Sequence, residues 1–342
     1  MKKPGHYSLD EIKKQDISFK SVRNSYEDIS IVTKAAFKSR PDQVIFTGCG
    51  TSFYLAASIS NYFIKYMDIP SIYLPCSELE LNSDSYIKNR KTLIIPFTRC
   101  STTTEVRSAV EKCRKLPNVE ALAISCDAGS LKYNDYAILC TGTDEKSIVM
   151  TRSFSSMLYA GMIMIDILRG EISKKLMKLP DIAVNFIPEI EQAARELALK
   201  IKNSSLLVAL GQGKYFGIAG ETSIKIKEMC IIPTEVYHTM EYRHGPISIA
   251  NDNTVFIIYT NDKTAFNDLK LIKEILDLGT LVICVGEKII EELKDIAYAY
   301  FNIPENCLPL SIVPAQYLGL YWSLAKGLDP DIPRNLSKAI VL

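Results

Sequence analysis

The sequence lacks a run of apolar residues long enough to cross a membrane. The longest apolar stretches, near residues 156–168 and 206–210, are too short or are interrupted by polar residues. The first residues of the chain are charged and have no apolar core of the kind found in signal peptides. These absences exclude a single membrane span and predict a cytoplasmic protein.

Surplus charge and paired cysteines are missing as well. The formal net charge is +1, and no basic cluster stands out, so the composition gives nucleic acid no surface to bind. The 9 cysteines are scattered without a C-x-x-C pair, which argues against both a disulfide framework and a zinc site. We therefore expect no nucleic-acid partner, no metal and no cofactor.

Short apolar runs alternate with helical patterns along the chain, which predicts an α/β fold with parallel sheets covered by helices. Residues 44–56 align with 207–219, and residues 92–98 align with 254–260, at a nearly constant offset of about 160 residues. The repeat predicts two copies of one domain related by internal duplication. Expected segments are a helical arm at 1–40, a first domain at 41–170, a helical linker at 171–201, a second domain at 202–328 and a tail at 329–342. Ser8 to Glu11 resembles a helix start.

One predicted helix, roughly residues 216–230, carries three charged residues on one face. Glu221, Lys225 and Glu228 are spaced at i, i+4 and i+7, so a base, an acid and an ammonium can address one small molecule. His244 follows, held by the turn residues Gly245 and Pro246. Taken singly, Glu221 and Lys225 are an ordinary surface ion pair and His244 an ordinary turn residue. Their joint occurrence after a strand and a Gly-x-Gly loop favours a functional site.

Each half has a Gly-x-Gly turn after a strand. Phe53 and Phe216 stand where a third glycine would complete a dinucleotide motif, and neither copy has the Gly-Lys-Ser/Thr of a Walker loop. The first half is instead rich in hydroxyls at two predicted helix starts, around Thr51 and around Thr98 to Thr104. Adjacent parallel strands would bring both loops to one sheet edge, where they predict a site for one phosphate group. The alternative is that these hydroxyls only cap the helices.

These residues resemble the tandem sugar isomerase (SIS) domain family, which includes the isomerase half of glucosamine-6-phosphate synthase and stand-alone glucosamine-6-phosphate deaminases. The resemblance spans nearly the whole chain and is most specific at Lys225 to Glu228, at His244 and in the tail from Asp331 to Lys338. It implies two three-layer α-β-α domains of the SIS type. It also implies a phosphate site, for which the candidates are Thr51, Ser52, Thr98, Arg99, Cys100 and Thr103, while Gly50 is a further substrate-site candidate. The second loop departs from the family pattern, because Cys100 replaces a serine and Ser101 replaces a glycine.

The resemblance further implies roles for the charged residues. Glu228 matches the carboxylate that moves a proton between C1 and C2, Lys225 a helper lysine, and Glu221 remains a substrate-site candidate. His244 matches the ring-opening histidine, which the family contributes across a homodimer interface. Lys338 matches a tail lysine that forms a Schiff base, whereas a tail lysine is by default a solvated, mobile charge. The apolar end at residues 339–342 predicts that the tail packs down.

The sequence thus predicts a sugar-phosphate isomerase that deaminates glucosamine-6-phosphate to fructose-6-phosphate and ammonia. Two alternatives stay open: a deglycase that releases an amino acid from a phosphorylated fructosamine, and a sugar-phosphate sensor without turnover. The sensor has no need to keep Glu228, His244 and Lys338 together. No glutaminase half with a nucleophilic cysteine precedes the isomerase-like part, so we expect this chain by itself not to be a glutamine-dependent synthase.

Overall fold

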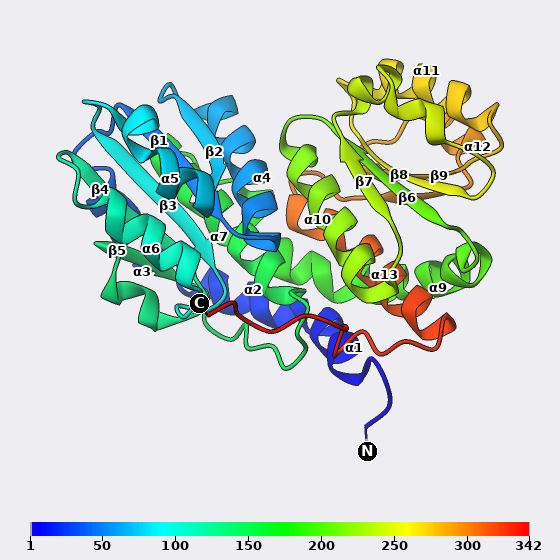
Figure 1. Cartoon of the computed structure of the whole chain (residues 1–342), viewed down its shortest axis with the longest axis horizontal. Coiled ribbons are helices and arrows are strands. Elements are labelled where there is room, and N and C mark those ends of the chain that lie inside the picture. Colours follow the sequence, from blue (N-terminus) through cyan, green and yellow to red (C-terminus); the bar gives the residue numbers. More distant parts are fainter. Residues whose placement is uncertain (1, 342) are drawn as a thin grey trace. The chain divides into compact units, whose positions relative to one another are not determined.

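The computed structural model describes residues 2–341, so both extreme ends of the predicted arm and tail, Met1 and Leu342, lie outside it. The chain forms two compact units, each with its own parallel sheet (Figure 1). Unit 1 comprises the residues up to Lys13, Lys146–Thr151 and Asp181–Leu336. Unit 2 comprises Lys14–Glu145, Arg152–Pro180 and the residues from Ser337. The segment boundaries expected from the sequence stay a prediction.

Unit 2 is built on a five-stranded parallel sheet with the order β2-β1-β3-β4-β5. Helices α4 and α7 pack on each other, as do α5 and α6, since successive crossovers place helices on both faces of such a sheet. The strands are β1 (Gln43–Gly48), β2 (Ser71–Pro75), β3 (Thr92–Thr98), β4 (Val119–Ser125) and β5 (Tyr136–Leu139). The helices are α2 (Gln15–Asn24), α3 (Tyr26–Ala36), α4 (Thr51–Tyr66), α5 (Cys76–Ile87), α6 (Thr104–Cys113), η1 (Ala128–Lys132), α7 (Arg152–Arg169) and α8 (Lys174–Met177).

Unit 1 repeats the plan with the strand order β10-β9-β8-β6-β7. Its strands are β6 (Leu206–Gly211), β7 (Thr234–Tyr237), β8 (Thr254–Thr260), β9 (Leu281–Gly286) and β10 (Ala299–Asn302). Its longer helices are α1 (His6–Lys13), α9 (Leu179–Ile201), α10 (Lys214–Cys230), α11 (Ala265–Leu276), α12 (Glu291–Ile296) and α13 (Val313–Ala325). Unit 1 also contains the short 3-10 helices η2 (Thr239–Arg243), η3 (Pro246–Ile249) and η4 (Leu308–Ile312).

The apolar runs seen in the sequence form the central strands. All residues of β1, β3 and β8 are buried, as expected for strands covered by helices on both faces. The prediction of an α/β fold with two three-layer halves is therefore confirmed. Within residues 2–341, none of the helices combines the length and the apolar character that crossing a bilayer requires.

Two local expectations about the chain ends are wrong. Ser8 and Glu11 do not start a helix, because α1 begins at His6. Instead, Ser8 donates from its N–H and its hydroxyl to Asp331 Oδ1, both at 2.7 Å, and Glu11 accepts from Ser147. The apolar end of the tail is also not packed down, since Ile340 is 54% exposed and Val341 70% exposed. The tail is held by its backbone and by Lys338 instead.

Candidate active site

The two loops predicted to hold phosphate lie at the same edge of the unit 2 sheet. Strands β1 and β3 are parallel neighbours in the register Thr47 to Pro96, so the loops that follow them emerge side by side. Gly50 precedes α4 with φ 54° and ψ −123°, a conformation that glycine adopts without strain. The equivalent Gly213 before α10 has φ 56° and ψ −127°. The duplicated turn is therefore the same in both halves.

The hydroxyls at these helix starts do not act as caps. The N-cap residue of α4 is Gly50, which has no side chain, and the N-cap residue of α6, Thr103, forms no side-chain capping hydrogen bond. Among the described residues, no hydrogen bond is recorded for the hydroxyls of Thr51, Ser52 or Thr103. The Thr98 hydroxyl already has a partner within its own loop, because it donates to the Cys100 carbonyl at 2.7 Å. Three hydroxyls at two adjacent helix N-termini thus remain available to a ligand, and the capping interpretation fails.

Ser101, which replaces a glycine of the family pattern, is anchored by Asp127. Its N–H and its hydroxyl donate to Asp127 Oδ2 at 2.9 and 2.6 Å. These bonds, with a further one from the Gly129 N–H, lower the pKa of Asp127. Ser101 is not among the residues with positive φ, so its side chain causes no backbone strain. Cys100 Sγ lies 2.8 Å from the Thr102 hydroxyl. No local pattern in the sequence marks Asp127.

Arg99 and Lys338 both bind Glu145, the first through its buried carboxylate and the second through its backbone carbonyl. Arg99 Nη1 lies 3.1 Å from Glu145 Oε2, and the Glu145 side chain is fully buried. Arg99 Nη2 also donates to the Lys338 carbonyl at 2.8 Å. Lys338 Nζ in turn donates to the Glu145 carbonyl oxygen, so this lysine is held and is not a mobile charge. Ser153 completes the group by donating to both Glu145 oxygens at 3.0 and 2.7 Å.

The tail also reaches the helix that follows the second phosphate loop. The Thr104 N–H, in the first turn of α6, donates to the Ile340 carbonyl at 3.1 Å. Arg99, predicted as a phosphate ligand, therefore connects the phosphate loop to the tail that carries Lys338. Sequence analysis missed Glu145, because its partners lie far along the chain and no spacing pattern marks it.

In unit 1, Glu221, Lys225 and Glu228 lie on one face of α10 as their spacing predicts. Lys225 Nζ is 3.8 Å from Glu221 Oε1 and also forms an ion pair with Glu228 Oε2. The side chains of Lys225 and Glu221 are 1% and 0% exposed, whereas that of Glu228 is 19% exposed. The interpretation of Glu221 and Lys225 as a surface pair is therefore wrong. A buried ammonium lies beside a carboxylate that solvent can still reach.

His244 lies on the turn that the sequence predicted. It follows η2, and its N–H donates to the Glu241 carbonyl at 3.0 Å, while Gly245 turns the chain with φ 117° before Pro246. The residue is exposed. Among residues 2–341, its imidazole forms no hydrogen bond or ion pair, so none connects it to Glu228. The neighbouring Arg243 is fixed by Glu274 through two bonds of 2.7 and 2.9 Å.

A second histidine, His238, was overlooked. Its Nδ1 lies 3.0 Å from Gln212 Oε1, and its ring stacks on Phe216 with centroids 4.0 Å apart. Burial lowers its pKa, which favours the neutral imidazole. Its place at the end of β7, beside the Gly211–Gly213 turn, follows from strand pairing that the sequence alone does not reveal. Among the described residues, no group of three or more His, Cys, Asp and Glu side chains is arranged to hold a metal ion.

The second half does not repeat the phosphate-binding chemistry of the first. Lys214 stands where the first half has Thr51, and its ammonium lies 3.0 Å from Glu287. After β8, the hydroxyls of Thr260 and Thr264 both donate to Asp268 Oδ2 at 2.6 Å. The hydroxyls at this loop thus bind the Asp268 carboxylate and are not available to a ligand.

We expect Asp268 to make the stability of the protein depend on pH. Burial raises its pKa from 3.8 to about 6, so between these values the folded state binds more protons than the unfolded state. Stability is therefore highest at the low-pH side and is lost as pH rises through this window. Between about pH 4.5 and 7, the free energy of unfolding in urea should fall by about 2 kcal/mol more for the wild type than for Asp268→Asn. Asp277→Asn, on an exposed residue just after the same helix, should track the wild type. Equal pH dependence of wild type and Asp268→Asn would contradict the assignment.

Several known proteins are similar to this chain over nearly its whole length. No family model matches the chain. Isomerizing glutamine–fructose-6-phosphate aminotransferases from Pyrococcus horikoshii and Bacillus subtilis are 27% and 25% identical over 98% of this chain. The chain spans 58% of the length of each of these relatives.

A solved structure matches over both chains. Glucosamine-6-phosphate deaminase from Thermotoga maritima superposes with a TM-score of 0.82 and 28% identity, covering 98% of this chain and 100% of that one. The chain has the sugar isomerase (SIS) fold. Tagatose-6-phosphate ketose/aldose isomerase from Escherichia coli shares this fold, with a TM-score of 0.84 and 20% identity over 100% of this chain and 99% of that one.

The homologues of the chain are thus the SIS isomerase domain of glutamine–fructose-6-phosphate aminotransferases, and its structural neighbours include SIS phosphosugar isomerases. This confirms the resemblance drawn from the motifs around Lys225 and His244 and from the tail. The roles of individual residues within the SIS fold stay predictions.

Proposed function

We propose that the chain converts glucosamine-6-phosphate and water to fructose-6-phosphate and ammonia. The observation that carries the proposal is the buried Lys225 beside the accessible Glu228 on α10, because proton transfer at carbon needs a base next to a cation. The full-length match to a glucosamine-6-phosphate deaminase supports the choice of an amino sugar. The hydroxyls of Thr51, Ser52 and Thr103 bind the phosphate.

The reaction proceeds in three steps. His244 first opens the sugar ring by protonating the ring oxygen while the C1 hydroxyl loses its proton. Glu228 then removes the proton at C2, and the resulting enolamine is protonated at C1, which leaves an imine at C2. Lys225 stabilises the negative charge that develops between these atoms. Water finally adds to C2 and ammonia leaves, giving the ketose phosphate.

The first experiment follows ammonia and fructose-6-phosphate together when the purified chain is incubated with glucosamine-6-phosphate and no glutamine. Equal release of both products is the expected result. Release of an amino acid from a phosphorylated fructosamine, with no ammonia from glucosamine-6-phosphate, would favour the deglycase. Binding of sugar phosphates without any turnover would favour the sensor.

The proposal includes a homodimer in which the partner's His244 opens the ring. We expect His244→Ala to slow turnover of the cyclic substrate by about 10²- to 10⁴-fold, which is the usual contribution of a general acid–base. Turnover of a ring-opened analogue should fall far less. Equal losses on both substrates would contradict the ring-opening role. Mixing His244→Ala chains with Glu228→Gln chains tests the sharing of the site. Random exchange should restore about a quarter of the wild-type activity, because half of the dimers then contain one intact site.

A further inference from the structure

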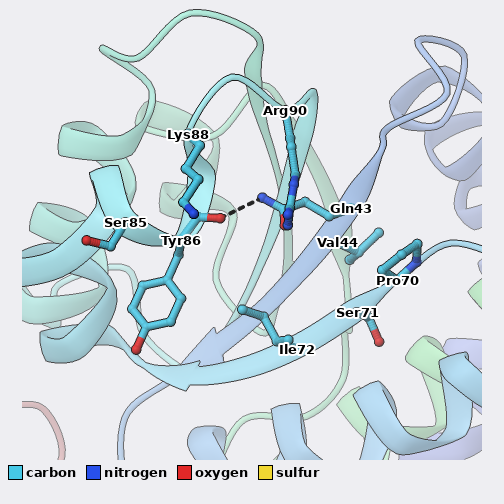
Figure 2. A pocket seen from close by; sticks show the side chains of 9 residues that line it. All are labelled: Gln43, Val44, Pro70, Ser71, Ile72, Ser85, Tyr86, Lys88 and Arg90. Atoms are coloured by element: carbon cyan, nitrogen blue, oxygen red, sulfur yellow. Dashed lines mark hydrogen bonds between the residues drawn. The ribbon is translucent and has the colours of Figure 1, made fainter.

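Unit 2 contains a cavity of about 190 Å³ at the edge of its sheet opposite the phosphate loops (Figure 2). It opens where β1 and β2 begin and where α5 ends. Strand β1 runs from the cavity to the Gly50 turn, a distance of about 17 Å for its six residues. The cavity is therefore separate from the predicted phosphate site. Its lining residues are Gln43, Val44, Pro70, Ser71, Ile72, Ser85, Tyr86, Lys88 and Arg90.

Two cations, Lys88 and Arg90, line this cavity. Figure 2 shows the side chains of Lys88 and Arg90 extending from the loop that follows α5, and that of Arg90 reaches Gln43 on β1. Among residues 2–341, no carboxylate forms an ion pair with either side chain. Two positive charges that form no ion pair, on a concave surface, attract a multivalent anion.

A buried glutamine holds the guanidinium of Arg90 in place. Arg90 Nη1 donates to Gln43 Oε1 at 3.0 Å, and Gln43 is only 5% exposed. The Gln43 amide nitrogen in turn donates to the Tyr86 carbonyl at 3.0 Å and to the Thr92 hydroxyl at 2.9 Å. Because this glutamine is fixed by both bonds, it orients the guanidinium before any ligand arrives. The remaining N–H groups of the arginine suit a phosphate group, which its planar fork binds well.

Lys88 occupies a backbone conformation that favours glycine. It ends α5 with φ 50° and ψ −131°, close to the values that Gly50 and Gly213 adopt in their turns. A side chain at this φ strains the backbone. Strained residues of this kind cluster at functional sites, where the side chain has a role that offsets the strain. A lysine in place of glycine here puts its ammonium at the rim of the cavity. Both the strained backbone of Lys88 and its charge therefore favour a cavity that binds an anion.

The opposite side of the cavity is apolar. Val44, Pro70 and Ile72 form it, and Tyr86 contributes from α5. Ligand sites combine such apolar walls with a few placed polar groups. We propose that the cavity binds a small organic phosphate, with the phosphate on Lys88 and Arg90 and the carbon skeleton on the apolar wall. This second site is independent of the function proposed above.

The test uses phenyl phosphate, which joins a dianion to an apolar ring, and equilibrium dialysis with the full chain. Lys88→Gly and Arg90→Ala should each weaken one binding event by about 10- to 100-fold, the effect of losing a hydrogen bond to a charged group. Lys91→Ala, which removes an exposed neighbouring charge outside the cavity, should leave binding unchanged. Lys88→Gly also relieves the strained φ, so its melting temperature should not fall, and a loss of binding cannot then come from unfolding.

The count of bound probe separates this proposal from the proposed function. If the phosphate loops also bind the probe, the wild type binds two molecules and each variant binds one. If the loops do not bind it, the wild type binds one molecule and the variants bind none. In both cases the variants lack one molecule. Unchanged binding by Lys88→Gly and Arg90→Ala, or a loss that Lys91→Ala shares, would overturn the proposal.

Discussion

Glu228→Gln should lower turnover of glucosamine-6-phosphate by about 10²- to 10⁴-fold while leaving sugar-phosphate binding nearly unchanged. Glutamine has the shape of glutamate, but it cannot take up the proton at C2. The amide oxygen can still accept a hydrogen bond from Lys225, so the local packing on α10 is retained. In the proposed function, phosphate binding rests on the unit 2 loops, which this substitution does not touch. Product release and equilibrium binding of the substrate measure the two effects separately.

A matched substitution controls for the loss of a charge. Glu292→Gln removes an exposed carboxylate from α12 of the same unit and should leave both turnover and binding at the wild-type level. If Glu228→Gln lost binding together with turnover, the residue would be structural and its role as a proton shuttle would be unsupported. If it kept full turnover, another base would have to act at C2.

Lys225→Met should destabilise the folded protein by about 3–5 kcal/mol, the effect of removing one partner of a buried ion pair. Methionine fills a similar volume, so the loss arises from charge and not from a cavity. Glu221 is 0% exposed, and without the Lys225 ammonium its carboxylate loses the cation 3.8 Å away. Urea unfolding at neutral pH measures the free energy of unfolding.

The double variant Lys225→Met/Glu221→Gln separates charge from packing. It removes the buried carboxylate as well, so it should recover most of the stability that the single variant loses. Lys227→Met, an exposed lysine on the same helix, should change the free energy of unfolding by less than about 0.5 kcal/mol. A destabilisation of Lys225→Met below about 1 kcal/mol, or no recovery in the double variant, would show that the pair is not electrostatically coupled.

The features of this protein that follow from local pattern were predictable from its sequence. Buried apolar runs such as residues 92–97 predict central strands, because only a strand covered on both faces is apolar throughout. The spacing of Glu221, Lys225 and Glu228 places them on one face of a helix, since the period of an α-helix is set by the backbone. The Gly-x-Gly pattern predicts a tight turn after each strand, and Gly50 and Gly213 adopt the positive φ that such a turn requires.

Burial and long-range contacts were decided by the tertiary structure. The sequence could not show whether the ion pair of Glu221 and Lys225 is exposed or buried, because the i, i+4 spacing is the same in both cases. It could not place Glu145, whose carboxylate holds Arg99 and whose carbonyl holds Lys338, because these residues are far apart along the chain. Nor could it show that Ser8 binds Asp331 and does not start a helix. Periodicity reports which face of an element is apolar, whereas the partners of a polar group depend on how distant segments pack.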